Sequence, residues 1–266
     1  QTLSKCVICT PVLAVTAQFE RMRHAVRNLG HGGIAAMAIS AVDSALWDLK
    51  ARVLQVSLVA LLGPVRDAIP VYGSGGFTSY DESKLEEQLA EYERRGISRV
   101  KMKVGSDPDQ DVERVRAARG AIGLHAELFV DANGAYSRKQ ALVFADRFAE
   151  LGVSWFEEPV SSDDLDGLRL LRDRAPAKVE ISAGEYGYDA AYFERMLRTG
   201  AVDVLQADAT RCGGITGFLR VAALAETFGL PLSSHCAPSI HAHLGCTCAR
   251  MRHAEYFHDH VRIEAL

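Results

Sequence analysis

The stretch Trp155-Phe156-Glu157-Glu158-Pro159 decides how the rest of the chain is interpreted. It begins in an apolar run and ends in two adjacent carboxylates, and the proline prevents regular pairing from continuing. This pattern predicts a buried strand whose carboxyl end opens onto a polar site. Because side chains alternate along a strand, only one of Glu157 and Glu158 can share the face of Trp155. Two acids at a strand tip are also consistent with a solvated turn, so the neighbouring strands must decide.

Short apolar runs alternate with amphipathic helical patterns along most of the chain. The eight candidate strands are residues 69–72, 100–104, 128–131, 153–157, 181–185, 202–206, 230–235 and 254–257. Helical patterns between them include residues 85–95, 112–121, 139–151 and 218–228. Strands that alternate with helices and are apolar on both faces form parallel sheets. Eight such units favour a closed barrel, and no G-x-G-x-x-G motif follows an early strand to support a dinucleotide-binding sheet.

The N-terminal part of the chain is predicted to be helical. Residues 19–29 form a basic helical stretch, and residues 34–54 repeat apolar side chains with the period of a helix that has one buried face. The expected buried positions are Ala35, Ala38, Ile39, Val42, Leu46, Leu49 and Val53, and the expected polar positions are Asp43, Asp48, Lys50 and Arg52. Gly63-Pro64 ends this segment.

Composition excludes several classes of protein. The chain has 266 residues, 48% of them hydrophobic, which suits one α/β barrel or two small domains. A formal net charge of −4, with the charges interspersed, offers no basic surface for nucleic acid. No apolar run reaches the length of a membrane span and no signal peptide is recognisable, so no membrane partner and a cytoplasmic location are expected.

The six cysteines are expected to be reduced thiols, because disulfide frameworks belong to much shorter secreted chains. Cys6 and Cys9 have the C-x-x-C spacing, and Cys246 and Cys248 lie near histidines, so a structural zinc site is an alternative. There is no second C-x-x-C pair, and the stretch around Cys246 has the pattern of a packed helix. Packing is therefore favoured over zinc.

Polar side chains follow the predicted strands about once per βα unit. They are Lys101 and Lys103, Asp131 and Asn133, Glu157, Glu185, Asp208, His235 and Glu255. Successive positions from Lys103 to Glu255 are 20 to 28 residues apart, which is about the length of one unit. Since active sites of such barrels gather at the carboxyl ends of the strands, this regular spacing predicts one there.

Three consecutive positions, Asp131, Glu157 and Glu185, are carboxylates. Side by side they would repel one another unless a cation lay between them, so their clustering predicts a divalent metal. Ligation by oxygen alone suits Mg²⁺, or Mn²⁺, better than zinc. For any one of these acids a helix cap or a surface salt bridge is the simpler interpretation; the metal is favoured for the set.

The basic positions predict proton transfer. Lys101 and Lys103 are two apart on one strand, so they share a face, and each ammonium is expected to lower the pKa of the other from about 10.4 toward neutrality. His235 follows one strand and Asp208 the strand before it, an arrangement in which a carboxylate orients an imidazole for proton transfer. Glu255 could hydrogen-bond a developing oxyanion if it is protonated.

These residues resemble the enolase superfamily, in its mandelate racemase and muconate lactonizing enzyme branch. The matching motifs are Ala38-x-Ser40-Ala41-Val42-Asp43-x-Ala45-Leu46-x-Asp48-Leu49, Leu61-Leu62-Gly63, Lys101-Met102-Lys103, Asp131-Ala132-Asn133, Phe156-Glu157-Glu158-Pro159, Ala183-Gly184-Glu185, Asp208 with Gly213-Gly214, and Ser233-Ser234-His235. The resemblance implies a TIM-type (β/α)₇β barrel at residues 66–258, preceded at residues 1–65 by a partial or truncated α+β capping domain that is mainly helical. Residues 259–266 would begin the return to that domain.

The resemblance also implies a set of roles. Asp131, Glu157 and Glu185 would bind Mg²⁺; Lys103 would act as one base and the His235–Asp208 dyad as the other, on the opposite face of the substrate. Lys101, Asn133 and Glu255 would bind a small-molecule carboxylate, and a homo-oligomer is expected from the family. Removal of the proton α to the carboxylate would give a metal-stabilised enediolate.

Dehydration of an acid sugar to a 2-keto-3-deoxy product is the activity that the resemblance favours. A racemase, epimerase or cycloisomerase acting on the same site is the alternative within the family. A non-catalytic barrel that binds a metal or a carboxylate is an alternative from another class, because a reduced cap could leave the site open to water.

Overall fold

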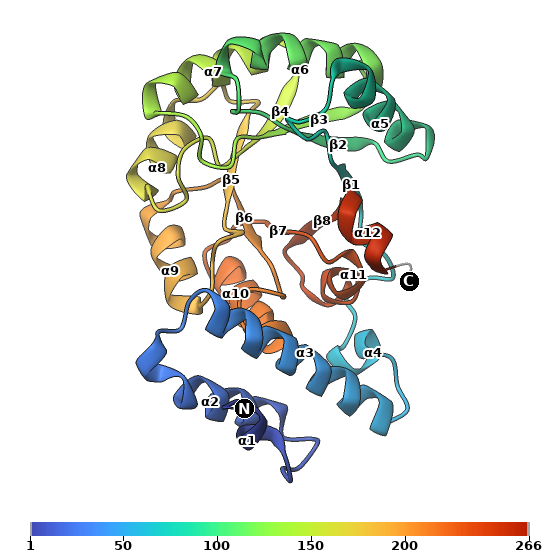
Figure 1. Cartoon of the computed structure of the whole chain (residues 1–266), viewed down its shortest axis with the longest axis vertical. Coiled ribbons are helices and arrows are strands. Elements are labelled where there is room, and N and C mark those ends of the chain that lie inside the picture. The colour runs from blue at the N-terminus through green and yellow to red at the C-terminus, as the bar shows by residue number, and fades with distance from the viewer. Residues whose placement is uncertain (1, 265–266) are drawn as a thin grey trace. The chain divides into compact units, whose positions relative to one another are not determined.

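The computed structural model of the chain describes residues 2–264, and its eight parallel strands close into a barrel in the order of the sequence (Figure 1). The strands are β1 Val71–Ser74, β2 Arg99–Lys103, β3 Glu127–Asp131, β4 Val153–Glu157, β5 Glu180–Ala183, β6 Val204–Ala207, β7 Leu232–Ser234 and β8 Met251–Phe257. A barrel closed in this order, with helices between its strands, is the predicted TIM-type α/β fold. That prediction is confirmed.

Helices separate the strands and form the N-terminal segment. They are α1 Ser4–Val7, α2 Val15–Ala25, the 3₁₀ turn η1 Arg27–Leu29, α3 Ile34–Val53, α4 Leu58–Leu62, α5 Glu82–Arg94, α6 Pro108–Ile122, α7 Arg138–Glu150, α8 Leu165–Arg174, α9 Ala190–Thr199, α10 Gly214–Thr227, α11 Pro238–Thr247 and α12 His258–Glu264. Of the predicted C-terminal segment 259–266, residues 265–266 lie outside the described residues. No helix in residues 2–264 is both long enough and apolar enough to cross a membrane.

The predicted strands match the observed ones except at their ends. β4 occupies the predicted residues, whereas β1 begins two residues later than predicted and β8 three residues earlier. The helix predicted over residues 19–29 differs from the observed one. Helix α2 begins earlier, at Val15, and ends at Ala25, and a short 3₁₀ turn follows it. Strand and helix ends are decided by pairing and capping partners, which the local pattern does not contain.

The chain divides into two compact units. The first comprises Gln1–Ile69, Gly184–Arg195 and Gln206–Ala254, and the second comprises Pro70–Ala183, Met196–Leu205 and Glu255–Leu266. In the second unit, strands β1 to β5 pair in parallel and in sequence order, and β6 pairs with β5. An apolar cluster of Tyr72, Phe129, Trp155 and Val204 fills the interior of this sheet, with the rings of Phe129 and Trp155 stacked at 5.1 Å.

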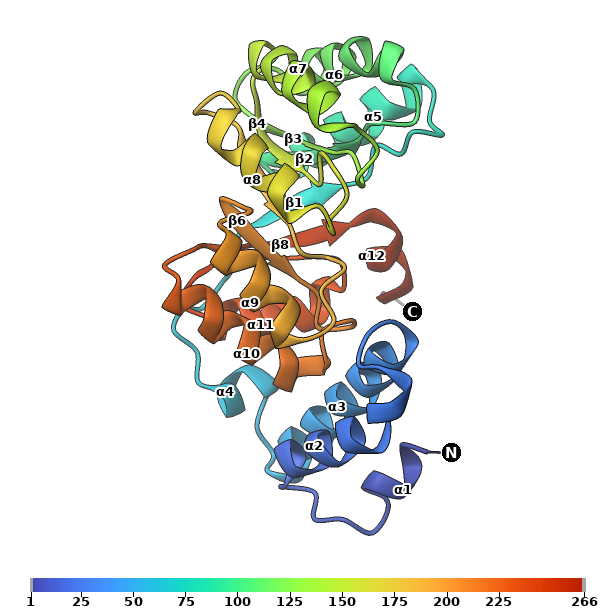
Figure 2. The ribbon, with the colours of Figure 1, turned by 90° about the vertical axis from the view of Figure 1, so that its left-hand side faces the viewer.

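In the first unit, α3 packs against both α2 and α10, and α2 and α3 lie side by side (Figure 2). Phe19, Met22 and Val26 pack against Ile39 to form an apolar cluster. Because α2 and α3 join through apolar side chains and α3 packs against α10, this part of the unit supports α10.

The face of α3 that is buried differs from the predicted one. Asp43, expected at a polar position, is fully buried, whereas Leu49 and Val53 are 42% and 55% exposed. The reason lies in α10: the Asp43 carboxylate accepts hydrogen bonds from Thr216 N at 2.9 Å and Thr216 Oγ1 at 2.7 Å. Helical periodicity could not reveal this contact, because the partner is 173 residues away.

The Asp43 contact makes stability depend on pH. Burial raises the pKa of Asp43 from 3.8 to about 6, although hydrogen bonds from Thr216 oppose this. Since the folded-state pKa is raised, the contribution of Asp43 is fully present below the unfolded pKa and is lost as the pH rises through 6. Between pH 4 and 7, the free energy of unfolding of the wild type should therefore fall relative to Asp43→Asn by up to about 3 kcal/mol, measured by chemical denaturation.

Asp48→Asn is the matched control on the same helix, because Asp48 forms only an exposed ion pair with Arg52. Its difference from the wild type should stay below about 0.5 kcal/mol throughout. A wild-type to Asp43→Asn difference that does not change with pH would contradict the prediction.

Candidate active site

One row of the second unit's sheet carries charged residues at the carboxyl ends of three adjacent strands. Lys103 on β2 is in register with Asp131 on β3, which is in register with Glu157 on β4. Because residues in register share a face of the sheet, the three side chains lie together. Lys103 Nζ donates a hydrogen bond to Asp131 Oδ2, and the Asp131 and Glu157 side chains are fully buried.

Lys101 lies one row below and is completely buried. Its Nζ is 2.6 Å from Glu157 Oε1, 3.0 Å from Glu255 Oε1 and 3.6 Å from Asp131 Oδ2. It therefore joins acids from three strands, β3, β4 and β8. The structure brings Lys101, Lys103, Asp131, Glu157 and Glu255 into one cluster, as the sequence predicted for strand-end residues.

The prediction for the pKa of Lys101 is wrong. Burial alone would lower the pKa of Lys101, but the charges of Glu157 and Glu255 outweigh it and hold this pKa well above its ordinary value. Lys101 is therefore a fixed ammonium rather than a base near neutrality. The error arose because the sequence shows that two lysines share a face but not that three carboxylates surround one of them.

The pKa values of the neighbouring acids Glu157 and Asp131 are shifted in opposite directions. Burial and the charge of Asp131 raise the pKa of Glu157 to about 8, against the opposing charge of Lys101. Burial would also raise the pKa of Asp131, but Lys103 and Lys101 lower it to about 2.

Glu157 shares the face of Trp155, as required of a residue aimed at the site, and accepts a hydrogen bond of 3.0 Å from Trp155 Nε1.

Asn133 lies at the rim of this cluster. Its backbone N–H donates a 2.9 Å hydrogen bond to Asp131 Oδ1, and its residue has a left-handed φ of 44°. With Lys103, Thr78 and Ser106 it lines a surface hollow beside the strand ends. Its side chain is exposed, so Asn133 is accessible to a bound molecule.

The first unit contains the histidine and its partner. His235, directly after β7, places Nδ1 at 2.9 Å from Asp208 Oδ2, directly after β6. Asp208 is held in turn by Thr210, whose N–H and Oγ1 donate to Asp208 Oδ1 at 2.7 and 2.8 Å. Burial would raise the pKa of Asp208, but the hydrogen bond from His235 and its charge lower it overall. The predicted pair thus has the geometry of an oriented imidazole.

Glu185 lies in the same unit, two residues after β5. Its Oε2 is 3.2 Å from His235 Nε2. Gly184 before it has a φ of +137°, and a Cβ there would lie 2.0 Å from the carbonyl oxygen of Gln206, so only glycine allows the chain to reach this position. The structure therefore brings Glu185, Asp208 and His235 together.

Sequence reasoning missed two residues beside this group. Arg211 lies 3.6 Å from Glu185 Oε1 and 3.7 Å from Asp208 Oδ2, and its Nη1 donates to the Glu185 carbonyl oxygen at 3.0 Å. The Cys236 Sγ lies 3.3 Å from His235 Nε2. The sequence could have indicated these residues only through their closeness to predicted site residues, since Arg211 follows Asp208 by three residues and Cys236 directly follows His235.

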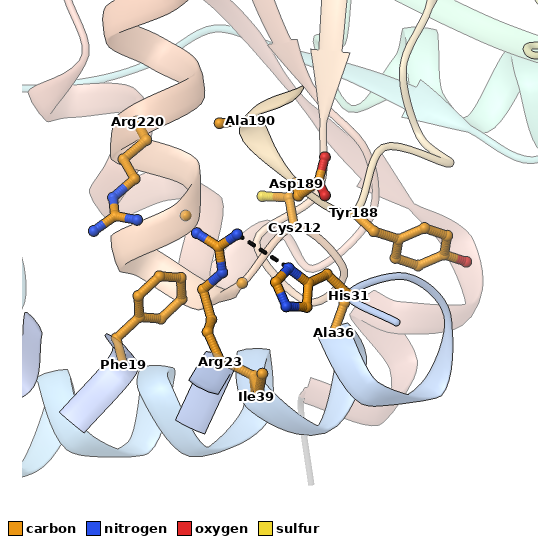
Figure 3. A pocket seen from close by; sticks show the side chains of 12 residues that line it. Phe19, Arg23, His31, Ala36, Ile39, Tyr188, Asp189, Ala190, Cys212 and Arg220 are labelled. Atoms are coloured by element: carbon orange, nitrogen blue, oxygen red, sulfur yellow. Dashed lines mark hydrogen bonds between the residues drawn. The ribbon is translucent and has the colours of Figure 1, made fainter. Parts of the chain in front are cut away.

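A pocket elsewhere in the first unit contains none of the predicted site residues (Figure 3). It is lined by α2, α3 and the start of α10, and Arg23 donates to His31 Nδ1 at 3.2 Å in its wall. Arg23 and Arg220 both lie over the ring of Phe19, at 5.9 and 4.8 Å. The guanidinium groups of Arg23 and Arg220 therefore both pack against the aromatic wall of this pocket.

Comparison with known proteins agrees with this geometry. Residues 84–266 match the family model described as enolase C-terminal domain-like, and residues 1–63 match the N-terminal domain of mandelate racemase / muconate lactonizing enzyme. The chain belongs to the mandelate racemase and muconate lactonizing enzyme family of the enolase superfamily. The resemblance noted from the motifs is confirmed, and the match to the N-terminal domain extends it to residues 1–33.

Among its relatives is the arabinonate dehydratase of Saccharolobus solfataricus, 34% identical over 82% of this chain and 58% of its own length. A solved structure of a mandelate racemase/muconate lactonizing enzyme-like protein from Rubrobacter xylanophilus is 53% identical, with a TM-score of 0.97 over 100% of this chain and 74% of that one. L-Talarate dehydratase from Polaromonas sp. JS666, solved with Mg and L-glucarate, is 35% identical, with a TM-score of 0.88 over 96% of this chain and 68% of that one.

Replacing Lys101 with methionine should destabilise the protein in a pH-dependent way. Without this ammonium, the pKa values of the buried acids around it should rise, so stability is lost as the pH increases. Breaking a buried pair by removing one partner costs about 3–5 kcal/mol. Chemical denaturation without divalent cations should therefore show a larger loss for Lys101→Met at pH 8 than at pH 5.

Lys139→Met is the matched control, because Lys139 is an exposed lysine at the start of α7. It should change the free energy of unfolding by less than about 0.5 kcal/mol at both pH values. An equal loss for Lys101→Met at pH 5 and pH 8 would show that the carboxylates do not depend on this ammonium.

Proposed function

We propose that this protein removes the proton α to a carboxylate, with Mg²⁺ as cofactor, and that its activity is the dehydration of an acid sugar. The chain spans 58% of the length of the arabinonate dehydratase, so its activity is a proposal rather than a finding. The observation that carries the proposal is the register row of Lys103, Asp131 and Glu157, which places a base beside two buried acids at the strand ends.

We infer that Asp131, Glu157 and Glu185 are the metal ligands. Asp131 and Glu157 are the last residues of β3 and β4, and Glu185 comes two residues after β5, the next strand in the barrel order; all three are buried acids. Two observations fit a cation: Asp131 and Glu157 are fully buried carboxylates in register on neighbouring strands, and burial together with the charge of Asp131 raises the pKa of Glu157 to about 8. Three carboxylates are the hard oxygen donors that Mg²⁺ prefers, and Mn²⁺ would fit the same set.

The roles of the bases follow from their partners. Asp208 accepts the Nδ1–H of His235, so Nε2 presents a lone pair that can take a proton. The Lys103 side chain pairs with Asp131 and is 17% exposed, so its Nζ can exchange protons with a substrate. We assign these two groups to opposite faces of the α-carbon, as in the family. Mg²⁺, when bound, supplies positive charge to the substrate carboxylate as the proton leaves.

Lys101 and Glu255 are assigned to substrate binding. Lys101 keeps its charge because acids surround it, and it can therefore attract a carboxylate and stabilise negative charge at a fixed place. Glu255 is held by Lys101 at 3.0 Å and can donate a hydrogen bond to a carboxylate oxygen when protonated. Asn133 at the rim offers an exposed amide to a polyol chain.

In the proposed dehydration one base removes the α-proton. The electron pair of the broken C–H bond then forms a double bond between the α-carbon and the carboxylate carbon. A proton given to the β-hydroxyl lets it leave as water, and the enol that results becomes the 2-keto-3-deoxy acid. The L-talarate dehydratase solved with L-glucarate supports acid sugars as the substrate class.

We propose that residues 1–65 act as the capping domain, because their first 63 residues match the N-terminal domain of the family. Residues 66–258 would then be the catalytic barrel, and residues 259–266 would begin the return to the cap. The homo-oligomeric state that the family implies stays a prediction.

The activity can be tested with Mg²⁺ and a panel of aldonic and aldaric acids in D₂O. At least one acid should exchange its α-proton and yield a 2-keto product, and Lys103→Ala and His235→Asn should each lower kcat by at least about 100-fold. Mass spectrometry and proton NMR measure both readouts, and Lys139→Ala is the control lysine. Product with an inverted centre would indicate a racemase or epimerase instead. If no acid exchanges, proton abstraction is wrong.

The metal ligands can be tested separately from activity. Glu157→Gln should weaken Mg²⁺ binding about tenfold or more, because it replaces a charged ligand with a neutral one. Glu158→Gln is the matched control: the residue is adjacent, equally buried, and expected on the other face of the strand. Isothermal titration calorimetry gives both affinities. Equal losses in the two variants would remove Glu157 from the ligand set.

A further inference from the structure

His241, on α11 in the first unit, is a fully buried histidine whose two ring nitrogens both meet backbone groups. Ala209 N–H donates to His241 Nε2 at 3.0 Å, so Nε2 carries no proton. The proton is on Nδ1, which donates to the Cys236 carbonyl oxygen at 2.7 Å. The ring is thus neutral: Nδ1–H donates one hydrogen bond and Nε2 accepts the other.

The two backbone groups are neighbours of the dyad. Ala209 directly follows Asp208, and Cys236 directly follows His235. One imidazole therefore ties the loop after β6 to the loop after β7, at one residue from each member of the acid–base pair. The same segments are also joined by the 2.9 Å contact from His235 Nδ1 to Asp208 Oδ2 and by the 3.0 Å bond from His235 N–H to the Ala207 carbonyl oxygen.

The backbone at this point is strained. Cys236 and Ala237 have φ values of 52° and 40°, in the left-handed region that non-glycine residues seldom adopt. Such conformations are strained and persist only where surrounding contacts hold them. His241 supplies two such contacts, from Nδ1–H to the Cys236 carbonyl and from its own N–H to the Ala237 carbonyl at 3.1 Å.

The strained turn determines where the catalytic nitrogen lies. Because Cys236 adopts this conformation, its Sγ lies 3.3 Å from His235 Nε2 while His235 Nδ1 remains on Asp208. If the turn relaxed, the His235 backbone would rotate and the imidazole would lose its alignment. The ring of Phe218 packs on His241 at 5.2 Å and limits the rotation of His241 itself.

We propose that His241 is a positioning residue that sets the tautomer and orientation of the His235–Asp208 dyad by joining the loops that carry its two members. The catalytic consequence rests on the proposed function, whereas the structural consequence does not. His241 touches no reacting group; it acts through Ala209 and Cys236. Glutamine should replace it in part, because its side-chain amide can both accept and donate, whereas leucine can do neither.

The test uses the full chain and two independent readouts. Long-range ¹H–¹⁵N NMR of the histidine rings, with His235→Asn to assign the signals, reports the tautomer of His235 without any substrate. His241→Leu should remove the single Nδ1–H tautomer of His235, and His241→Gln should retain it. With an acid that is turned over, kcat of His241→Leu should fall about 10- to 100-fold while KM changes less than about threefold.

His243→Leu is the matched control, since His243 lies on the same helix and is only partly buried. It should leave the His235 signals unchanged and kcat within about twofold.

If His241→Leu does not fold, His241→Asn decides, because its side chain keeps a donor for Cys236 but is too short to reach Ala209. His241→Asn should lower kcat. A wild-type kcat and tautomer in this variant would overturn the proposal. Unchanged His235 signals in a folded His241→Leu would overturn it equally. Loss of the tautomer in a protein that turns over no acid would support the proposal and refute the function.

Discussion

The burial of Lys101 among three carboxylates is the interaction on which the second unit's site depends. Taking an ammonium and several acids out of water costs several kcal/mol per ion, and only close pairing in good geometry repays it. The parallel register of β2, β3 and β4 provides that geometry, since it places Lys101 beneath the row that contains Asp131 and Glu157. Glu255 arrives from β8 to complete the set. A shift of one residue in any of these strands would turn its charged residue to the other face.

In the first unit, hydrogen bonds stabilise the buried charge of Asp208. Asp208 is buried and charged, so its oxygens need donors, and it finds them in Thr210 and His235. His235 is thereby held in one tautomer, and His241 contacts the backbone that directly follows His235. The two units therefore differ: charge balance determines the lysine group of the second, and fixed donor–acceptor direction determines the histidine group of the first. Both are ways to hold a reactive side chain still before a substrate arrives.

Two residues show where reasoning from the sequence succeeded and where it stopped. Side-chain alternation along a strand showed that only one of Glu157 and Glu158 can share the face of Trp155, and the family resemblance chose Glu157; the bond from Trp155 to Glu157 agrees with that choice. Asp43 was assigned to a polar position because helical periodicity treats a carboxylate as a surface residue, yet it is buried against Thr216. The same limit explains Lys101: a pattern identifies which face a residue shares, but a pKa depends on charges brought in from other strands.

The sequence by itself determined the order of the elements, the closed barrel and the polar positions at the ends of the strands from the second onward, because apolar period and spacing are local properties of the chain. It also determined family membership through its ordered motifs. The tertiary structure alone decided the partners: which acids surround Lys101, which helix covers Asp43, and which loops His241 joins. These depend on contacts between residues tens to hundreds of positions apart, and such contacts exist only after the chain has folded.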